Sequence, residues 1–406
     1  MERILSRENL LRAFRQVERN GGSPGIDGMT VKELRPYLRD NWLSIRDALI
    51  RGKYRPRPVR RVEIPKPGGG LRKLGIPTVL DRFIQQGILQ VLQSICDPKF
   101  SPFSYGFRPG RSCHQAVQQA QRYIRCGYAW VVDLDLEKFF DRVNHDVLMR
   151  KLASFISDRK VLRLINRYLQ SGVLVGGVLE ATVEGTPQGG PLSPLLANVL
   201  LDSFDRELER RGLLFVRYAD DSNIYVRSRR SAIRVLRSVS QYLSRHLKLQ
   251  VNKSKSAVGR PWERQFLGFS FTTTRKRCLS VKALKQVKAK IRELTRRTRG
   301  RKILDVIKEL RLYLRGWIGY YGYIEIRSIL KELDSWIRRK LRCYLLKQWG
   351  RGSYRELRRR GISRSLAWNT VKSAHGPWRL SRSPALSIAL PGRYFDKMGL
   401  PRLYAQ

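Results

Sequence analysis

Two short runs of apolar residues, 213–216 and 224–226, flank the tetrapeptide Tyr218-Ala219-Asp220-Asp221. Apolar residues recur at every second position in both runs, which is typical of β-strands with one buried face. The pattern therefore predicts a β-hairpin with both carboxylates at its tip. Adjacent carboxylates repel each other, so a cation that prefers oxygen ligands, such as Mg²⁺, would stabilise this tip. A solvated acidic turn explains the segment about as well when it is taken alone.

A second apolar run, residues 128–135, ends in Asp133 and Asp135. Its β-branched residues predict a buried strand, where a carboxylate is unfavourable unless something compensates its charge. If this strand lies beside the hairpin, Asp135 meets Asp220 and Asp221, and together they can hold two Mg²⁺ ions about 3.5–4 Å apart. One ion would lower the pKa of a primer 3′-hydroxyl, and the other would stabilise the departing pyrophosphate. This constellation indicates nucleotidyl transfer.

Helical periodicity dominates most of the remaining chain. Asn144 is a candidate N-cap for the helix that follows it, and Ser193-Pro194 is a candidate helix start. The other expected elements are a helix-turn-helix over residues 1–50, a basic hairpin over 59–76, amphipathic helices over 81–96, 110–125 and 233–247, and a strand over 266–271.

The charge of the chain indicates what kind of partner it binds. The 406 residues include 82 Lys and Arg against 33 Asp and Glu, a formal net charge of +49, which predicts a polyanionic partner. Residues 275–380 alone hold 31 Lys and Arg but only 7 Asp and Glu, interleaved with aromatic residues. We expect basic helices that bind a phosphate backbone with some aromatic stacking, although Trp317 and Trp336 are expected to belong to the core. An exposed basic turn around Gly300 is expected to contact nucleic acid through Arg296, Arg297, Arg299 and Arg301.

Composition also excludes several classes of protein. Hydrophobic residues make up 42% of the chain, enough for folded cores in two to four domains and too many for a disordered basic tail. The five cysteines form no CxxC pair and, with four histidines, provide neither a zinc site nor a disulfide framework, which is typical of a reducing cytoplasm. No apolar run reaches membrane-spanning length, and the first residues lack a signal-peptide core. We therefore expect a cytoplasmic protein that does not bind a membrane.

A series of motifs, in order along almost the whole chain, resembles group II intron-encoded reverse transcriptases and maturases, in particular the short bacterial proteins of class C introns. The matching segments are Gly25-Ile26-Asp27-Gly28, Ile64-Pro65-Lys66-Pro67-Gly68-Gly69, Leu74-Gly75-Ile76-Pro77, Tyr105-Gly106-Phe107-Arg108-Pro109-Gly110-Arg111, Asp133-Leu134-Asp135-Leu136-Glu137-Lys138-Phe139-Phe140-Asp141, Thr186-Pro187-Gln188-Gly189-Gly190, Tyr218-Ala219-Asp220-Asp221, Phe266-Leu267-Gly268-Phe269 and Gly316-Trp317-Ile318-Gly319-Tyr320-Tyr321.

The resemblance implies an α+β fold of the right-hand polymerase type. Its parts would be an N-terminal extension (residues 1–50), fingers and palm (51–272), a helical thumb or maturase (X) domain (273–345) and a basic DNA-binding (D) domain (346–406). Many relatives end in a His/Cys-rich endonuclease domain, and no such pattern follows Trp378. We therefore expect no second-strand cleavage, so that integration would need a primer from elsewhere, such as a replication fork.

The same resemblance assigns a metal site. Asp135, rather than Asp133, matches the catalytic aspartate of its motif, and Asp220 and Asp221 complete the set. The backbone carbonyl of Leu136 would join the ligands of two Mg²⁺ ions, for which Mn²⁺ can substitute.

A dNTP site is implied as well. Lys66 and Arg72 match residues that contact the incoming triphosphate, and Gln188 matches one near its base and sugar. Phe140 matches the aromatic residue that packs against the sugar and excludes a 2′-hydroxyl.

The implied protein is an RNA-directed DNA polymerase that binds group II intron RNA, assists its splicing and copies it into DNA during retrohoming. Its partners would be the intron RNA, an RNA template with a DNA primer, dNTPs and target DNA; a homodimer is one open arrangement. It would act in the bacterial cytoplasm, associated with the nucleoid when it acts on DNA. Two alternatives remain open: a splicing maturase with little polymerase role, against which the three aspartates and Phe140 argue, and a domesticated reverse transcriptase in defence or repair.

Overall fold

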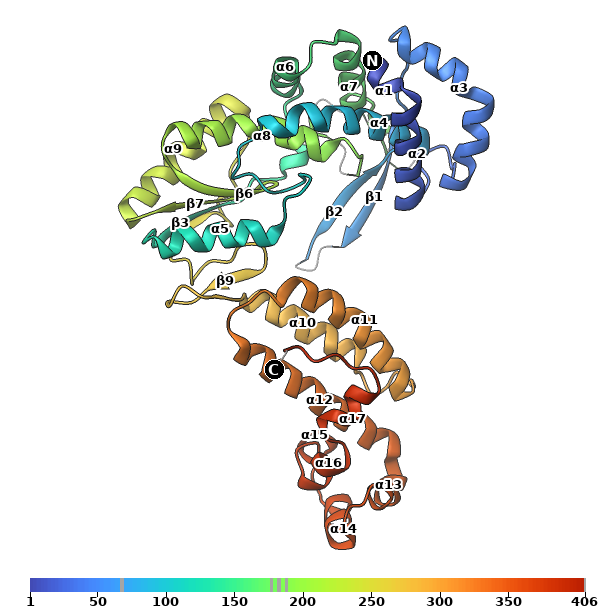
Figure 1. Ribbon diagram of the computed structural model, residues 1–406, viewed down its shortest axis with the longest axis vertical. Helices are drawn as coiled ribbons and strands as arrows, with labels where there is room; N and C mark the ends of the chain where they lie inside the picture. The colour runs from blue at the N-terminus through green and yellow to red at the C-terminus, as the bar shows by residue number, and fades with distance from the viewer. Residues whose placement is uncertain (66–68, 176–177, 181–183, 187–188, 405–406) are drawn as a thin grey trace. The chain divides into compact units, whose positions relative to one another are not determined.

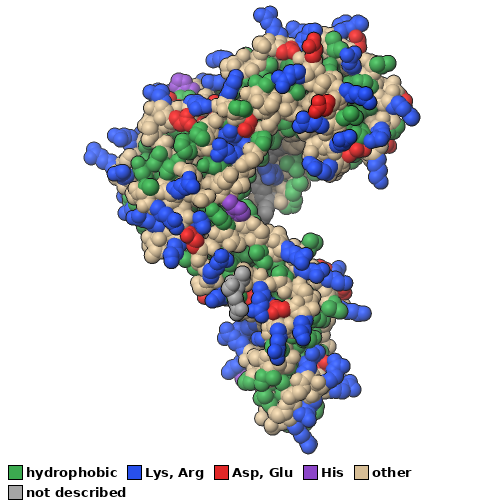
Figure 2. All heavy atoms as spheres, viewed as in Figure 1, with side chains coloured by type: hydrophobic (Ala, Val, Ile, Leu, Met, Phe, Trp, Pro, Cys, Tyr) green, Lys and Arg blue, Asp and Glu red, His purple; other side chains and the backbone are tan. Residues whose placement is uncertain are grey.

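The computed structural model describes residues 1–65, 69–175, 178–180, 184–186 and 189–404 (Figure 1). The chain divides into two compact units, Met1–Arg260 and Pro261–Gln406, and each combines helices with strands. Lys and Arg side chains cover much of the visible face of both units, with far fewer Asp and Glu (Figure 2). Among the described residues, no helix has the length and apolar character needed to cross a lipid bilayer.

The first unit opens with helices around a shared core. They are α1 (Glu2–Leu5), α2 (Arg7–Asn20), the 3₁₀ turn η1 (Val31–Glu33), α3 (Leu34–Ile50), α4 (Val79–Cys96) and η2 (Asp97–Lys99). Ser6 caps α2 by accepting a hydrogen bond from the backbone of Asn9, and Thr78 caps α4 in the same way. Phe14 of α2 packs edge-on against Phe83 of α4, with ring centroids 6.5 Å apart. The helix-turn-helix prediction for residues 1–50 is thus confirmed.

The predicted basic hairpin is also confirmed, as β1 (Val59–Pro65) and β2 (Leu71–Ile76). It belongs to a four-stranded sheet of order β2-β1-β4-β5, completed by β4 (Val173–Val175) and β5 (Val178–Glu180). β1 pairs antiparallel with β2 and parallel with β4.

A second sheet, of order β6-β7-β3-β8, carries the acidic segments. Its strands are β3 (Trp130–Leu134), β6 (Leu214–Tyr218), β7 (Asp221–Val226) and β8 (Ala257–Gly259), and every neighbouring pair is antiparallel. Against this sheet pack α5 (Cys113–Arg125), α8 (Ser193–Arg210) and α9 (Arg229–Leu247). The helices α6 (His145–Phe155) and α7 (Arg159–Leu169) pack against each other, and α6 also packs against α8. Asn144 caps α6 as predicted.

The hairpin is buried more deeply than its sequence pattern predicts. Alternation predicts one buried face, yet Phe215, Val216 and Arg217 are each 0% exposed. The reason is that α5 lies against one face of the hairpin, while α8 and α9 cover the other face (Figure 1). On the α5 side, Tyr123 packs against Tyr225 of β7 with ring centroids 5.6 Å apart.

The second unit is mainly helical. Its short hairpin consists of β9 (Phe269–Phe271) and β10 (Arg277–Leu279). The strand predicted over residues 266–271 forms only from Phe269 onward, because Leu267 and Gly268 have positive φ angles that an extended strand does not allow. Trp317 is buried as predicted, whereas Trp336 is only half-buried because it lines a cavity. The helices are α10 (Val281–Leu294), α11 (Ile303–Tyr321), α12 (Arg327–Trp349), η4 (Gly350–Gly352), α13 (Ser353–Arg359), α14 (Arg364–Lys372), α15 (Pro377–Leu380), α16 (Pro384–Ala389) and α17 (Gly392–Lys397).

Candidate active site

The acidic turn joins β6 to β7 within the first unit. Tyr218 pairs with Asp221, which leaves Ala219 and Asp220 as a two-residue turn. Ala219 has a φ angle of 58°, a left-handed conformation that disfavours a residue with a Cβ atom by about 1–2 kcal/mol. The surrounding structure must therefore hold this turn in place.

One support is the segment just before Phe107. The backbone NH of Arg217 donates to the carbonyl of Phe103 (3.0 Å), and the NH of Tyr105 donates back to the carbonyl of Arg217 (2.9 Å). Gly106 then lies so close to the turn that an added Cβ would sit 2.2 Å from the backbone nitrogen of Ala219. Only glycine allows this approach, which gives the Gly106 position of the motif a physical reason.

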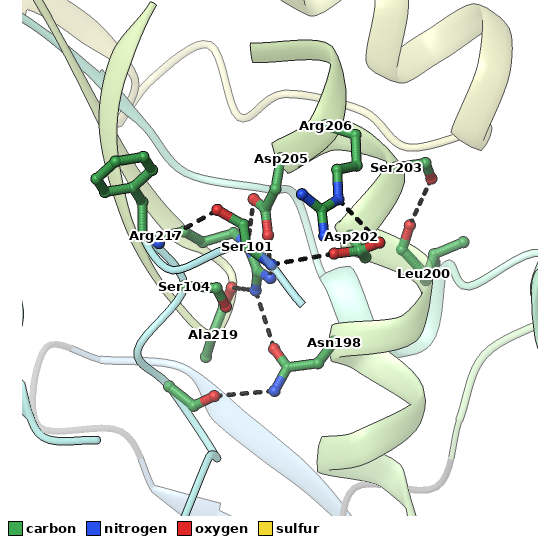
Figure 3. A network of polar contacts seen from close by, with 12 residues as sticks. Ser101, Ser104, Asn198, Leu200, Asp202, Ser203, Asp205, Arg206, Arg217 and Ala219 are labelled. Carbon is green, nitrogen blue, oxygen red and sulfur yellow. Dashed lines mark hydrogen bonds and ion pairs between the residues drawn. The ribbon is translucent and has the colours of Figure 1, made fainter. Parts of the chain in front are cut away.

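The other support is a buried polar network centred on Arg217 (Figure 3). Its Nε and Nη2 donate to the two carboxylate oxygens of Asp205, at 2.7 and 2.6 Å. Its Nη1 donates to Asn198 Oδ1 (3.0 Å) and to the carbonyl of Ala219 (2.8 Å), while Asn198 Nδ2 donates to the carbonyl of Gly106 (2.9 Å). Because Asp205 and Asn198 both belong to α8, the network fixes the turn and the Gly106 segment to one helix. Sequence reasoning missed Arg217; the available signal was a lone charge within the apolar run 213–218.

Asp135 directly follows β3, which is paired with β7 so that Leu134 faces Ser222. Its backbone NH donates to Ser256 Oγ (2.9 Å), and its carbonyl accepts from the NH of Asn252 (2.8 Å). Lys255 places its Nζ atom 3.3 Å from Asp135 Oδ2. The loop before β8 therefore positions Asp135 and contributes a positive charge, a role that the sequence did not reveal for Lys255.

The carboxylates of this region destabilise one another. Burial raises the pKa of Asp220, and repulsion by Asp135 acts in the same direction. Asp221 is partly exposed, but the burial of the rest of its carboxylate raises its pKa. Repulsion from Asp220, Asp135 and Asp133 acts in the same direction, so that the pKa of Asp221 is raised to about 7. A cation among these groups would relieve the repulsion and lower both pKa values.

Two further observations test whether the residues fit divalent cations. Asp135 Oδ2 is buried and accepts no well-oriented hydrogen bond. Lys255 lies close enough to form an ion pair with this oxygen. Within the described ranges, however, no three acidic, thiol or imidazole side chains converge tightly enough to form a preassembled metal cluster. The oxygen-rich, mutually repelling donor set fits a hard cation such as Mg²⁺, which would supply the positive charge that these carboxylates lack.

A cavity of about 1,060 Å³ connects these residues to the basic hairpin. Of the residues predicted from the sequence, Asp135, Leu136, Asp220, Arg72 and Phe140 line it, together with Lys255. Asp221 occupies the next position on β7 and is not among the lining residues. Lys66 and Gln188 lie outside the described residues.

Phe140 forms one wall of the cavity. It lies in the 3₁₀ turn η3 (Phe139–Asp141), half-buried, with its ring centroid 5.1 Å from that of Phe139. Its carbonyl accepts a hydrogen bond from the NH of Thr186 (2.7 Å), and a Cβ on Gly185 would lie only 3.0 Å from the same oxygen. Close backbone packing therefore fixes the chain at Phe140, whose side chain lines the same cavity as Asp135 and Asp220.

The four arginines expected to bind nucleic acid belong to the second unit, where they fall into two pairs. Arg299 and Arg301 both form ion pairs with Glu309 of α11, at 2.9 Å for Arg299. Arg299 Nη1 also donates to the carbonyl of Leu294 (2.9 Å), so this pair helps to shape the turn. Arg296 and Arg297 are exposed, and Arg297 Nη1 lies 3.8 Å from Cys343 Sγ.

Comparison with known proteins identifies the family of this chain. The family described as "Reverse transcriptase (RNA-dependent DNA polymerase)" matches residues 64–271, and "Group II intron, maturase-specific domain" matches residues 284–361. Protein YkfC of Escherichia coli (strain K12) is 33% identical over 274 residues, which cover 58% of this chain and 72% of YkfC. The group II intron-encoded protein LtrA of Lactococcus lactis subsp. cremoris is 39% identical over 181 residues, covering 44% of this chain and only 29% of LtrA.

Solved structures give a weaker likeness. Apo telomerase from Candida tropicalis superposes with a TM-score of 0.47 at 12% identity, covering 90% of this chain and 68% of that one. The sequence matches, which span most of the chain in two consecutive segments, carry the assignment. The chain belongs to the family of group II intron reverse transcriptases and maturases.

Proposed function

We propose that the chain is an RNA-directed DNA polymerase that also binds group II intron RNA, assists its splicing and copies it into DNA. One observation carries this proposal: Asp135 and Asp220, from segments about 85 residues apart in sequence, line one cavity with Arg72 and Phe140. A cavity of about 1,060 Å³ is large enough for a nucleoside triphosphate beside a primer end.

Each wall of the cavity has a role in this proposal. Asp135, Asp220 and Asp221, with the carbonyl of Leu136, would hold two divalent cations, Mg²⁺ or Mn²⁺, which supply the positive charge for nucleotidyl transfer. Arg72, exposed on β2, would bind the triphosphate, as would Lys66, and Gln188 would contact the base and sugar. The Phe140 ring would exclude a 2′-hydroxyl.

The proposal extends to the arrangement of the chain as a right-hand polymerase. Residues 51–272 would form fingers and palm behind an N-terminal extension (1–50), followed by a thumb or maturase domain (273–345) and a DNA-binding domain (346–406). The net positive charge of residues 275–380 supports contacts with intron RNA, template-primer duplex and target DNA.

The test is an Asp220→Asn variant in primer extension on an RNA template. A neutral ligand holds a divalent cation poorly, so extension should fall by at least about 100-fold, the reduction expected when one electrostatic interaction is removed. RNA affinity should persist, because it depends on many dispersed Lys and Arg contacts. Asp40→Asn, the same change at an exposed position of α3, serves as the control and should extend normally. Extension by Asp220→Asn at the wild-type rate would rule out the assignment.

Splicing of intron RNA by the same variant separates the two proposed activities. Asp220→Asn should support splicing as the wild type does, because the RNA-binding residues are unchanged. A wild-type protein that splices intron RNA but extends no primer would favour the maturase with little polymerase role.

A further inference from the structure

A cavity of about 320 Å³ lies within the second unit, at the low end of the range of small-molecule sites. Its lining includes Arg292 of α10, Arg297 of the following turn, Trp336 and Lys340 of α12, and Trp378 of α15. Buried Cys343 completes one side. The cavity thus combines three cationic side chains with two indole rings.

No acidic side chain is present among the described residues that line this cavity. Partial burial lowers the pKa of Lys340, and the charges of Arg292 and Arg297 lower it further. The contact of Arg297 with the Cys343 thiol, at 3.8 Å, does not neutralise its charge. An anion in the cavity would therefore be bound by three groups that otherwise repel one another.

The tryptophans make the site suitable for a base as well as for a phosphate. Arg292 Cζ and Lys340 Nζ lie 5.6 and 5.7 Å from the ring centroid of Trp336. Trp378, 37% exposed, lies beneath Arg339 Cζ at 3.7 Å, and its carbonyl accepts a hydrogen bond from Ser381 Oγ at 2.6 Å. Cationic groups interleaved with fixed aromatic rings are typical of sites for single-stranded nucleic acid, where bases are unstacked and accessible.

We propose that this cavity binds one unstacked nucleotide of a single-stranded RNA, with a phosphate between Arg292, Arg297 and Lys340 and the base against Trp336 or Trp378. The inference rests on the RNA-binding part of the proposed function. RNA is favoured over DNA because all of these residues except Trp378 lie within residues 284–361, which match the maturase-specific domain.

Photo-cross-linking tests the contact directly. The full chain is mixed with a 16-nucleotide single-stranded RNA in which 5-iodouridine replaces uridine, irradiated and digested, and cross-linked peptides are identified by mass spectrometry. We expect cross-links at Trp336 or Trp378 and none at Trp368, which also has a lysine over its ring but lies outside the cavity. An RNA of the same sequence in duplex form should give no cross-link at either cavity tryptophan.

Charge variants test the phosphate contact. Arg297→Gln/Lys340→Gln should lower the cross-link yield at saturating RNA about fivefold or more, because each hydrogen bond to a charged phosphate that is lost weakens local binding by at least about this factor. Lys282→Gln/Lys285→Gln removes the same charge from exposed positions of α10 and should leave the yield unchanged. The charge-conserving Arg297→Lys/Lys340→Arg should restore it, which distinguishes a charge effect from misfolding.

The outcomes are distinct. Binding of the RNA without cross-links at Trp336 or Trp378, or equal yields from the two glutamine double variants, would overturn the inference and leave the proposed function intact. Cross-links formed only with the corresponding DNA would replace RNA by DNA as the ligand. A wild-type protein that binds no RNA would contradict both the inference and the RNA-binding function.

Discussion

Arg217, a fully buried charge, connects the acidic turn of the candidate site to α8. Its guanidinium donates to Asp205, to Asn198 and to the carbonyl of Ala219, which lies next to Asp220. A buried ion pair contributes little net stability over an apolar pair, but removal of one partner leaves an uncompensated charge. The value of Arg217 is therefore that it fixes the acidic turn.

We predict that Arg217→Met destabilises the first unit by about 3–5 kcal/mol, because Asp205 is left buried and unpaired. The double variant Arg217→Met/Asp205→Leu should recover much of this stability, since both charges are gone. Urea unfolding followed by fluorescence measures both changes. A single variant as stable as the wild type would show that the network is not energetically coupled.

Phe140 permits a second prediction about one side chain. Phe140→Ala should open the cavity wall and raise incorporation of ribonucleotides relative to deoxyribonucleotides by at least about tenfold, the usual effect of one group in a binding pocket. Single-nucleotide addition with each substrate gives the ratio. Phe107→Ala, at an exposed aromatic position of the same unit, should leave it unchanged. If Phe140→Ala discriminates as sharply as the wild type, the ring serves only in packing.

The turn between α10 and α11 contains two kinds of arginine. Arg299 and Arg301 form ion pairs with Glu309, although Arg301 is itself exposed. Arg296 and Arg297 are exposed as well and form no ion pair with Glu309. Four arginines around Gly300 look equivalent in the sequence, but Glu309 of the next helix forms ion pairs with only two of them, Arg299 and Arg301.

We expect this division to appear in the salt dependence of RNA binding. Arg296→Gln/Arg297→Gln should flatten the slope of log affinity against log salt by about 0.7–0.9 for each phosphate that the protein no longer neutralises. Arg299→Gln/Arg301→Gln, which removes equal charge, should change the slope less and instead lower the melting temperature, because Glu309 is left without its partners. Titrations at several salt concentrations compare the two pairs. Equal slopes for both variants would mean that the ion pairs with Glu309 do not determine which of these arginines contact RNA.

The division of the chain into two compact units separates the acidic site from the most basic segment. Asp135, Asp220 and Asp221 lie in Met1–Arg260, while residues 275–380 lie in Pro261–Gln406. Cation binding and polyanion binding should therefore act on different parts of the chain.

We predict that Mg²⁺ at constant ionic strength slows amide hydrogen exchange in β3 and β7 but not in α12. Binding at 100 times the dissociation constant stabilises the native state by about 2.7 kcal/mol, and relief of carboxylate repulsion is local to the site. Exchange followed by mass spectrometry resolves these segments. Asp220→Asn should lose most of the protection, and equal protection in this variant would place the cation elsewhere.

Local pattern in the sequence was sufficient for much of the secondary structure. The hairpin around Asp220, the basic hairpin β1–β2, the cap at Asn144 and the helices of residues 1–50 follow from signals a few residues apart. These features are determined by backbone preference and by which face of an element is apolar, and both are properties of neighbouring residues. The order of motifs along the chain likewise indicates the family.

The sequence alone could not assign the partners of charged side chains. Lys255 forms an ion pair with Asp135, which lies 120 positions earlier in the chain. Arg217 of β6 binds Asp205 and Asn198 of α8. Glu309 forms ion pairs with two of the four arginines around Gly300. Nor could alternation reveal that helices cover both faces of the hairpin, or that Trp336 faces a cavity. Such contacts depend on how distant elements pack, and the free energy of a buried charge depends on the partner that packing supplies. The sequence by itself therefore determined the elements and the family, and only the tertiary structure decided which residues act together.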